Sequence, residues 1–253
     1  MINKDDLLAI AKLKGLPLSL AESDYLQDIA LMNISGEFGN RLVFKGGTCL
    51  YKAYKLNRFS EDLDFTATKN FKAGKFFERL PYLFGLLNIN CRVRLNRFAN
   101  ATNVYLDIHG PLYDGSRETI KTLILNISFR ERVMLPVVRY PYLPGYAEIR
   151  PFDLFAMAEE EILAEKVRAI YTRDKARDVY DLWYLLVRKS LPFDRALANK
   201  KLSHARIKFS MSTFQAKIDA KKSSWRRDLS ALISGELPDF DKVRKEIEQK
   251  ISE

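Results

Sequence analysis

Apolar and polar residues alternate along several stretches of this chain. The clearest are NINCRVRL (88–95), NVYLDIH (103–109) and TLILNISFRE (122–131), and DLDFTAT (62–68) follows the same pattern, while LVF (42–44) is a short apolar run. Successive side chains of a strand face opposite sides of a sheet, so each alternating stretch has one face for the core. We therefore expect a small, largely antiparallel sheet.

Helical periodicity flanks these strands. Ser19 and Glu22 have capping-box spacing and predict a helix over 19–34. A short helix is expected over 48–55, after a glycine pair. The stretch KFFERLPYLFGLL (75–87) predicts an amphipathic helix that is interrupted or bent near Pro81.

The second part of the chain has only helical patterns. A turn-rich connection between Pro136 and Pro151 separates the strands from a region with no strand signal of length, and helices are expected over 158–173, 176–189 and 242–251. Strands mixed with helices, followed by helices alone, indicate the α+β class. We place an α+β domain, with a sheet and flanking helices, at 1–150 and an all-helical domain at 151–253.

Composition narrows the class of protein. The 253 residues are 47% hydrophobic, enough for a substantial core. Charged residues interrupt the N-terminal segment before any apolar run reaches the length of a signal peptide or membrane span. The two cysteines lack metal-ligand spacing, and only two histidines are present. These features favour a cytoplasmic protein without a zinc site or a disulfide framework.

The net charge of +10 is concentrated in one segment. Residues 188–227 contain twelve Lys or Arg and two Asp, so that segment alone carries +10. Such a block can follow the phosphate backbone of a nucleic acid, or it can simply be a solvated surface that keeps the protein soluble. Charge alone does not choose between these interpretations.

The stretch FKGGTCLYKAYKLNRFSEDLDF (44–65) contains the strongest candidate for chemistry. In a strand, Asp62 and Asp64 project to the same side, which holds two negative charges close together. Paired carboxylates of this kind suit Mg²⁺ or Mn²⁺, which also bind water and phosphate oxygens. The preceding turn at Gly46, Gly47 and Thr48 offers backbone N–H groups to a phosphate.

A metal site beside a phosphate-binding turn implies phosphoryl or nucleotidyl transfer. Taken singly, a glycine pair is usually just a turn, and D-x-D occurs by chance at exposed strand ends. Arg58 and Ser60 lie between the two parts. They are candidates either for substrate contact or for a cap and a salt bridge that hold the loop.

Three motifs in order resemble a known family. KGGTCLYKAY, RFSEDLDF and AEKVRAIYTRDKARDVYDLWYL are similar to the signatures of the AbiEii/MenT-type nucleotidyltransferase toxins. This family belongs to type IV toxin–antitoxin systems and to the DNA polymerase β-like nucleotidyltransferase superfamily. The endings SSWRRDLSALI and LPDFDKV also resemble its C-terminal helices, so the likeness covers nearly the whole chain.

The resemblance assigns roles to individual residues. Gly47 and Thr48, next to Gly46, match the turn that would hold the triphosphate of an NTP, and Asp62 and Asp64 match the metal-binding carboxylates. The implied enzyme is a metal-dependent nucleotidyltransferase that uses Mg²⁺ or Mn²⁺ and an NTP.

Two residues of the helical part are implied as well. Lys166 matches the functional lysine, expected on the triphosphate, and Asp178 matches the aspartate of an Arg-Asp motif, with Arg177 beside it. Asp181 lies one helical turn further and is a second-rank candidate. Without the motifs, a salt bridge between two helices would be the preferred interpretation of Lys166 and Asp178.

One position departs from the family pattern. The chain has Asn126 where the family often carries a third metal carboxylate, and Asn adds no charge and cannot act as a base. Asp107, on a neighbouring strand candidate, is an alternative third carboxylate. Arg130 matches the arginine after the strand and is expected near the site.

The implied acceptor is RNA, in particular the 3′ end of tRNA, and the implied partner is a cognate antitoxin protein. Two other functions stay open: an RNA- or nucleotide-binding protein with reduced catalysis, and a nucleotidyltransferase acting on a protein or small-molecule hydroxyl. Four aromatic residues at helical spacing are assigned to the core rather than to the site: Tyr171, Tyr180, Trp183 and Tyr184.

Overall fold

The computed structural model describes all 253 residues, and the chain divides into two compact units. The first comprises Met1–Cys49 and Glu61–Ala156, and the second comprises Leu50–Ser60 and Met157–Glu253. No helix in the structure combines the length and apolar content needed to cross a membrane.

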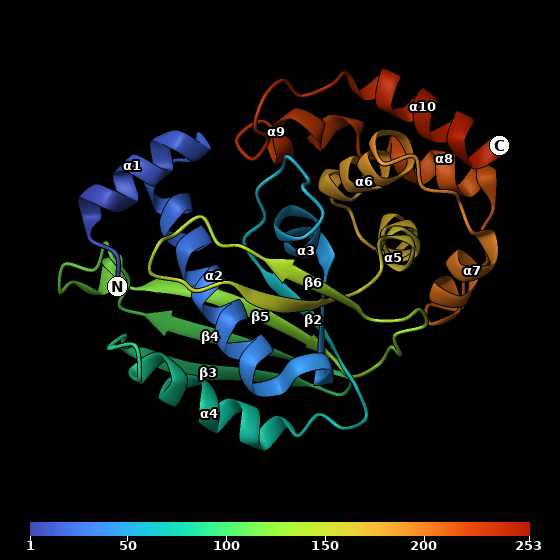
Figure 1. Cartoon of the computed structure of the whole chain (residues 1–253). Helices are drawn as coiled ribbons and strands as arrows, with labels where there is room; N and C mark the ends of the chain where they lie inside the picture. The colour runs from blue at the N-terminus through green and yellow to red at the C-terminus, as the bar shows by residue number, and fades with distance from the viewer. The chain divides into compact units, whose positions relative to one another are not determined.

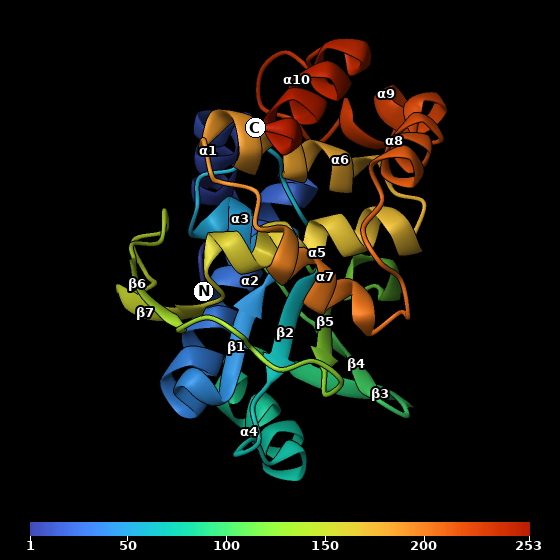
Figure 2. The same cartoon turned by 90° about the vertical axis from the view of Figure 1, so that its right-hand side faces the viewer.

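The first unit contains a seven-stranded mixed sheet with the order β3-β4-β5-β2-β1-β7-β6 (Figures 1 and 2). Four neighbouring pairs are antiparallel, whereas β1 with β7 and β2 with β5 are parallel. The strands are β1 (Leu42–Lys45), β2 (Leu63–Ala67), β3 (Cys91–Phe98), β4 (Ala101–Ile108), β5 (Lys121–Ser128), β6 (Val138–Tyr142) and β7 (Phe152–Ala156).

The alternation in sequence explains which sheet face is covered. Val104, Leu106 and Ile108 of β4 are fully buried, and so are Leu125 and Ile127 of β5. Helices α2 (Leu18–Phe38) and α4 (Ala73–Gly85) pack against strands of this sheet (Figure 1). The predicted strands over 103–109 and 122–131 are confirmed, and their polar residues take the other face.

Two local expectations for the helices are wrong. Helix α2 begins at Leu18 with Pro17 before it and no side-chain cap, so Ser19 and Glu22 form no capping box. Glu22 is buried, and its carboxylate instead accepts a hydrogen bond from the Leu112 N–H at 2.9 Å. Helix α4 continues through Pro81, so the first of the two expected effects, an interruption, does not occur.

The shorter helices of the first unit lie at its N-terminus and after β1. Helix α1 (Lys4–Lys14) is capped by Asn3, whose side chain accepts a hydrogen bond from the Asp6 N–H. Helix α3 (Gly46–Lys52) follows β1 directly, as the glycine pair predicts. Figure 2 shows β1, β2 and β5 side by side, in agreement with their pairing.

The second unit is helical, as expected. Helix α5 packs against α6, α7 and α8, and α10 packs against α6. Tyr171, Tyr180 and Trp183 are buried, so they belong to the core. The helices are α5 (Glu159–Thr172), α6 (Ala176–Trp183), the π-helical turn Tyr184–Arg188, α7 (Arg195–Ser203), α8 (Met211–Asp219), α9 (Trp225–Leu229) and α10 (Phe240–Ser252).

The basic block at 188–227 is not a uniform surface. The ammonium of Lys201 is fully buried between Glu161, at 2.6 Å, and Glu165, at 3.1 Å. Lys221 is also buried and donates hydrogen bonds to the carbonyl oxygens of Ile170 and Lys217. Two of the twelve cations therefore hold the second unit together and are not available to a polyanion.

The division of the chain differs from the predicted boundary at 150. Strand β7 pairs in parallel with the central strand β1, so the first unit extends to Ala156. Strands β6 and β7 were missed because they are short, and Pro141 lies within β6. Segment 50–60 joins the helical unit through long-range contacts that no local pattern predicts.

Candidate active site

The glycine pair forms a tight turn between β1 and α3. Gly46 has φ of +77°, a backbone conformation that side chains rarely adopt. A Cβ added there would lie 2.3 Å from the Asp64 Oδ2 atom. The absence of a side chain at Gly46 thus allows the backbone of the turn to lie against the Asp64 carboxylate.

Two hydrogen bonds fix the segment that carries the aspartates. The Thr48 hydroxyl donates to the carbonyl oxygen of Asp62, which joins the start of α3 to the residue before β2. On the other side, the Gln27 side-chain amide donates to the carbonyl oxygen of Glu61 at 2.8 Å. The turn and the D-x-D segment are therefore one connected piece of structure.

Asp62 and Asp64 occupy the beginning of β2. Asp62 directly precedes the strand, Asp64 is its second residue, and both are partly exposed. Asp64 is the register partner of Lys45 on one side and of Asn126 on the other. The Asn126 amide donates a hydrogen bond to Asp64 Oδ1 at 3.0 Å, which fixes the orientation of that carboxylate.

The donor set fits a hard divalent cation with two protein carboxylates. No group of three His, Cys, Asp or Glu side chains is arranged to hold a metal ion. Asn126 does occupy the position beside Asp64 where a third carboxylate is expected, but it contributes no charge. Mg²⁺ commonly binds one or two carboxylates together with waters and substrate phosphates, and Asp62 and Asp64 match that pattern.

Asp107 does not replace the missing carboxylate. Its register partner on β5 is Thr122, four residues from Asn126 along the strand. Its carboxylate accepts hydrogen bonds from Arg94 at 2.5 and 2.8 Å and from Thr122 at 2.7 Å. The expectation that Asp107 supplies a third metal ligand is wrong because the register places it in a different cross-strand row.

The sequence reasoning missed Lys45, the register partner of Asp64, and Glu131, with which Lys45 pairs. Lys45 is 8% exposed, and its ammonium lies 3.8 Å from a carboxylate oxygen of the buried Glu131. Arg130, expected near the site, donates to the other Glu131 oxygen at 2.7 Å. The available signal was the position of Lys45, which ends an apolar strand immediately before Gly46.

Lys166 lies in a network of buried charges within the second unit. Its ammonium is 2.9 Å from Asp178 Oδ1 and 2.6 Å from Asp181 Oδ2. The Arg173 guanidinium donates two further hydrogen bonds to Asp178, at 2.6 and 2.7 Å. Asp178 and Asp181 are both fully buried. The alternative interpretation, a salt bridge between Lys166 of α5 and Asp178 of α6, is therefore present.

The network keeps both carboxylates ionised. Burial on its own would raise the pKa of Asp178, but Lys166 and Arg173 outweigh it and lower that pKa. For Asp181, burial also acts to raise the pKa, and Arg58 and Lys166 lower it. At neutral pH two carboxylates and three basic groups are thus held at short range.

Arg58 belongs to the same network. Its guanidinium donates two hydrogen bonds to Asp181, at 2.9 and 3.0 Å, and a third to the Phe59 carbonyl oxygen. The Arg58 side chain is 1% exposed, and Ser60 is buried as well. The contacts of Arg58 fit the alternative in which it holds the loop through a salt bridge.

The sequence-predicted residues thus form two groups. Gly46, Thr48, Asp62, Asp64 and Asn126 are brought together in the first unit. Members of the other group lie in the second unit, connected by ion pairs: Arg58, Lys166, Asp178 and Asp181. The arginine that pairs with Asp178 is Arg173, rather than the adjacent Arg177 of the predicted motif.

Known proteins are similar to this chain in sequence and in fold. Residues 30–246 match the family described as Nucleotidyl transferase AbiEii toxin, Type IV TA system. MenT4, a nucleotidyltransferase toxin from Mycobacterium tuberculosis H37Rv, is 19% identical with a TM-score of 0.65, over 100% of this chain and 89% of that one. JHP933 from Helicobacter pylori is 22% identical with a TM-score of 0.59, over 94% and 92%. No curated protein matches.

Proposed function

This chain is a member of the AbiEii family of nucleotidyltransferase toxins, and from that premise we propose that it transfers a nucleotide from an NTP to the 3′ end of an RNA, with tRNA as the expected acceptor. The single observation that carries the proposal is the close approach of Gly46 to the Asp64 carboxylate. A turn that suits a phosphate and a carboxylate that suits a cation are adjacent in one unit.

In the proposed reaction Asp62 and Asp64 would hold Mg²⁺ or Mn²⁺. When bound, the cation supplies positive charge that polarises the phosphoryl group and stabilises the leaving pyrophosphate. The backbone N–H groups of Gly46, Gly47 and Thr48 orient the triphosphate. The Asn126 amide keeps the Asp64 carboxylate in position, and two carboxylates suffice because Mg²⁺ readily completes its shell with water and phosphate oxygens.

The role proposed for Lys166 is to neutralise the pyrophosphate as it forms. An ammonium has three N–H donors, and Asp178 and Asp181 take two of them in this structure. The third is left for a phosphate oxygen. Asp178 and Asp181 then act as positioning residues that fix the direction of the Lys166 ammonium, and Arg58 pairs with Asp181.

Two further elements of the proposal come from the family, and a third comes from the charge distribution. A type IV toxin has a cognate antitoxin, so we propose a small neutralising protein as the partner. We also propose that the protein acts in the cytoplasm, where NTPs and tRNA are present. The remaining exposed cations of the basic block supply one surface for the RNA.

The experiment is label transfer from each NTP to total tRNA in the presence of Mg²⁺ or Mn²⁺. We expect one NTP to label tRNA, and Asp62→Ala and Asp64→Ala to abolish the transfer while the circular dichroism spectrum stays unchanged. Folded protein that transfers no label with any nucleotide or metal contradicts the proposal. Full activity in both variants contradicts the assignment of the carboxylates.

The contact between Asn126 and Asp64 favours one alternative, a protein of the same fold with reduced catalysis. In that case RNA or nucleotide still binds, but turnover is slow because the site has one carboxylate fewer than the family pattern. Transfer to a protein or small-molecule hydroxyl is distinguished by the same assay, with those acceptors in place of tRNA.

A further inference from the structure

The sheet face that carries Asp64 continues as a polar surface across the neighbouring strands. Register pairs join Asp64 to Asn126, Asn126 to Asn103, and Asn103 to Asn96 on the edge strand β3. Cross-strand partners share one face of a sheet. The row that begins at the proposed metal site therefore reaches the sheet edge with uncharged, hydrogen-bonding side chains.

Two arginines follow on the same face of β3. Arg94 is two residues and Arg92 four residues from Asn96, and alternate residues of a strand face the same side. Their register partners on β4 are Tyr105 and Asp107. The opposite face of β4 is the one buried in the core, so these arginines lie on the uncovered face with Asp64.

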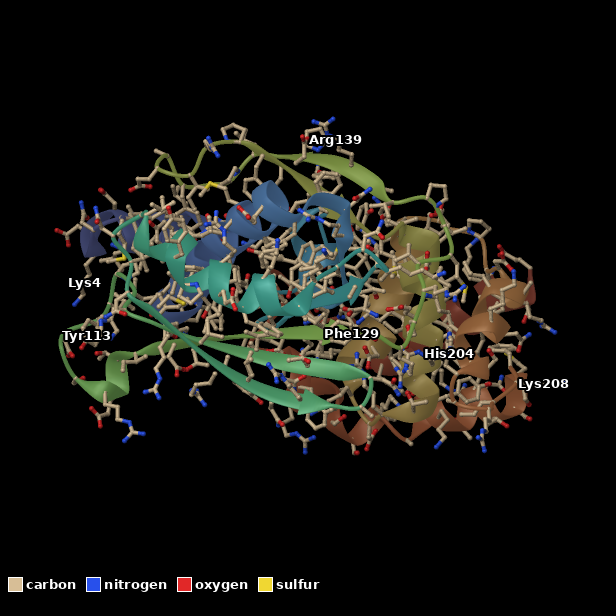
Figure 3. All side chains as sticks on the ribbon, turned by 90° about the horizontal axis from the view of Figure 1, so that it is seen from below. Lys4, Tyr113, Phe129, Arg139, His204 and Lys208 are labelled. Carbon is tan, nitrogen blue, oxygen red and sulfur yellow. The ribbon has the colours of Figure 1, made fainter.

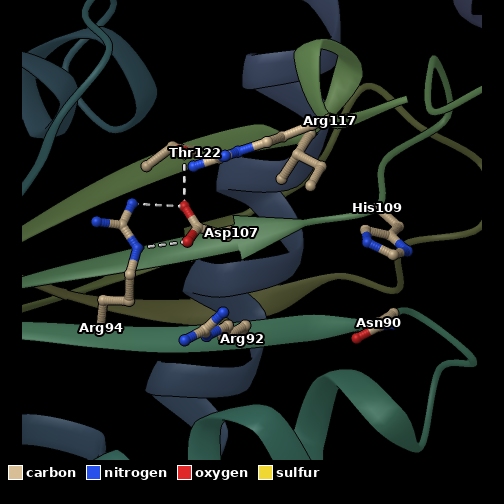
Figure 4. A pocket seen from close by; sticks show the side chains of 8 residues that line it. Asn90, Arg92, Arg94, Asp107, His109, Arg117 and Thr122 are labelled. Atoms are coloured by element: carbon tan, nitrogen blue, oxygen red, sulfur yellow. Dashed lines mark hydrogen bonds and ion pairs between the residues drawn. The ribbon is translucent and has the colours of Figure 1, made fainter. Parts of the chain in front are cut away.

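A recess of about 750 Å³ opens where these rows end (Figure 4). Its polar lining includes three arginines, one histidine, one aspartate and one threonine: Arg92, Arg94, Arg117, His109, Asp107 and Thr122. With His109 neutral, the three guanidinium groups and one carboxylate give the recess a net charge of +2. It is a concave, positively charged site in the first unit alone.

Only Arg94 among the three arginines forms an ion pair within the protein, although Arg92 also faces Asp107 across the strands and its charge contributes to lowering the pKa of Asp107. Arg94 and Asp107 form a bidentate ion pair, marked in Figure 4, and the hydrogen bond from Arg94 is the main cause that lowers the pKa of Asp107. Arg92 and Arg117 are exposed and make no hydrogen bond or ion pair with the chain. A guanidinium that makes no hydrogen bond to the protein can offer two N–H donors to the two oxygens of a phosphate.

The loop that carries Arg117 is held in place. Ser116 N–H and the Thr119 hydroxyl donate hydrogen bonds to the Asp114 carboxylate at 2.9 and 2.8 Å, and these bonds lower the pKa of Asp114 to about 2. His109 stacks on Tyr113 with ring centroids 3.8 Å apart. Figure 3 places Tyr113 beyond one end of β5 and Phe129 at the other. The recess thus lies at the Tyr113 end of the sheet, where these hydrogen bonds and the ring stacking hold the loop.

The distance from the recess to Asp64 fits a polynucleotide. Four residues along the strands and three strand spacings separate Arg92 from Asp64, which is roughly 19 Å. A single strand therefore needs several nucleotides to cover this distance. A strand whose 3′ end lies at Asp64 would pass over the asparagine row and bring an earlier phosphate to the recess.

We propose that Arg92, Arg94 and Arg117, with His109, form a binding site for backbone phosphate of the acceptor RNA, several nucleotides before its 3′ end. This inference rests on the proposed function, because it takes the acceptor to be a polynucleotide. The site is separate from the triphosphate turn at Gly46, and it is separate from the basic block that the sequence singles out.

The test measures RNA binding in the absence of NTP and metal. The readout is the fluorescence anisotropy of a labelled RNA of about a dozen nucleotides, recorded from about 50 to 200 mM salt. For the double variant Arg92→Ala, Arg117→Ala we expect roughly tenfold weaker binding near 150 mM salt. The slope of log K against log salt should fall by about 0.7 for each phosphate that the variant no longer neutralises. Arg92→Lys with Arg117→Lys should retain most of the slope.

Arg97→Ala is the matched control. Arg97 is exposed on the same strand but faces the opposite side, where its guanidinium lies over the Phe77 ring at 5.9 Å. The Arg97→Ala variant removes one arginine from β3, and we expect it to leave both the RNA affinity and the slope of log K against log salt unchanged. An equal decrease in the control would show that general charge, rather than the recess, attracts RNA.

The outcomes separate this inference from the proposed function. If the double variant binds RNA as the wild-type protein does, with the same salt slope, the recess is not an RNA site, whether or not nucleotide transfer occurs. If the double variant weakens the binding of ATP but not of RNA, the recess binds nucleotide instead, which also contradicts the inference. If RNA binding depends on the recess but no nucleotide is ever transferred, the proposed function fails and the recess assignment stands.

Discussion

Asn126 donates its side-chain amide to the Asp64 carboxylate at 3.0 Å across the parallel pair of β2 and β5. This contact places an uncharged group directly beside the proposed metal ligand. A carboxylate in its place would repel Asp64 in the absence of a cation and would attract a cation more strongly.

Asn126→Asp should therefore bind Mn²⁺ more tightly than the wild-type protein and should be less stable without metal. A titration of Mn²⁺ and thermal unfolding with and without the ion measure both effects. Asn103→Asp is the control, because Asn103 lies in the same row but one strand further from Asp64. If Asn126→Asp raises nucleotide transfer, the natural site is a reduced one; unchanged transfer with tighter metal binding indicates that two carboxylates are enough.

Gly46→Ala should abolish transfer. The added Cβ would lie 2.3 Å from Asp64 Oδ2, so the turn or the carboxylate must move, and the φ of +77° adds strain of about 1–2 kcal/mol. Gly235→Ala is matched for strain, since Gly235 has φ of +103° but no atom within 4 Å of an added Cβ. We expect both variants to lose stability in urea unfolding and only Gly46→Ala to lose activity. Equal activity in the two would contradict the role of the close approach.

The sequence predicts the sheet and the D-x-D segment well because both depend on local alternation. Asp64 lies near the start of β2 as expected, with Asp62 directly before the strand, and Asn126 lies where a third carboxylate would be. Strand register is not local, however. A shift of four residues along β5 separates Asn126 from Thr122, and this shift decides that Asp107 pairs with Arg94 instead of reaching the site.

The parts that the sequence could not predict involve partners far apart in the chain. Arg58 lies 123 positions before Asp181, and no pattern in its own segment indicates a helical partner. Lys221 resembles its neighbours in the basic block, although tertiary packing buries it. The recess at Arg92 and Arg117 was missed for the same reason, because a strand and a distant loop build it.

Asp178→Asn should reduce stability chiefly at neutral pH. The pKa of Asp178 is lower in the folded chain than the unfolded value of about 3.9, so its stabilising effect is present above pH ~4 and is lost as pH falls through the folded pKa. Removing one partner of a buried ion pair costs about 3–5 kcal/mol. Urea unfolding from neutral to acidic pH should show the variant approaching the wild-type protein as the pH falls.

Asp153→Asn is the control for that experiment. Asp153 forms an exposed pair with Arg139, and such pairs contribute less than about 1 kcal/mol. Its effect should be small at every pH. A destabilisation by Asp178→Asn that is no greater than that of the control would mean that the buried network does not stabilise the second unit.

The last prediction separates buried from exposed cations in the basic block. Lys221 donates to two backbone carbonyl oxygens, Ile170 and Lys217, and burial lowers its pKa. Its neighbour Lys222 is exposed and pairs with Asp241 at 2.8 Å. Lys221→Glu should unfold or strongly destabilise the protein, because an unpaired carboxylate would replace a satisfied donor in the core. Lys222→Glu should change the free energy of unfolding by less than about 1 kcal/mol and weaken RNA binding in a salt-dependent way. If both variants unfold at the same urea concentration, Lys221 does not have the structural role assigned to it.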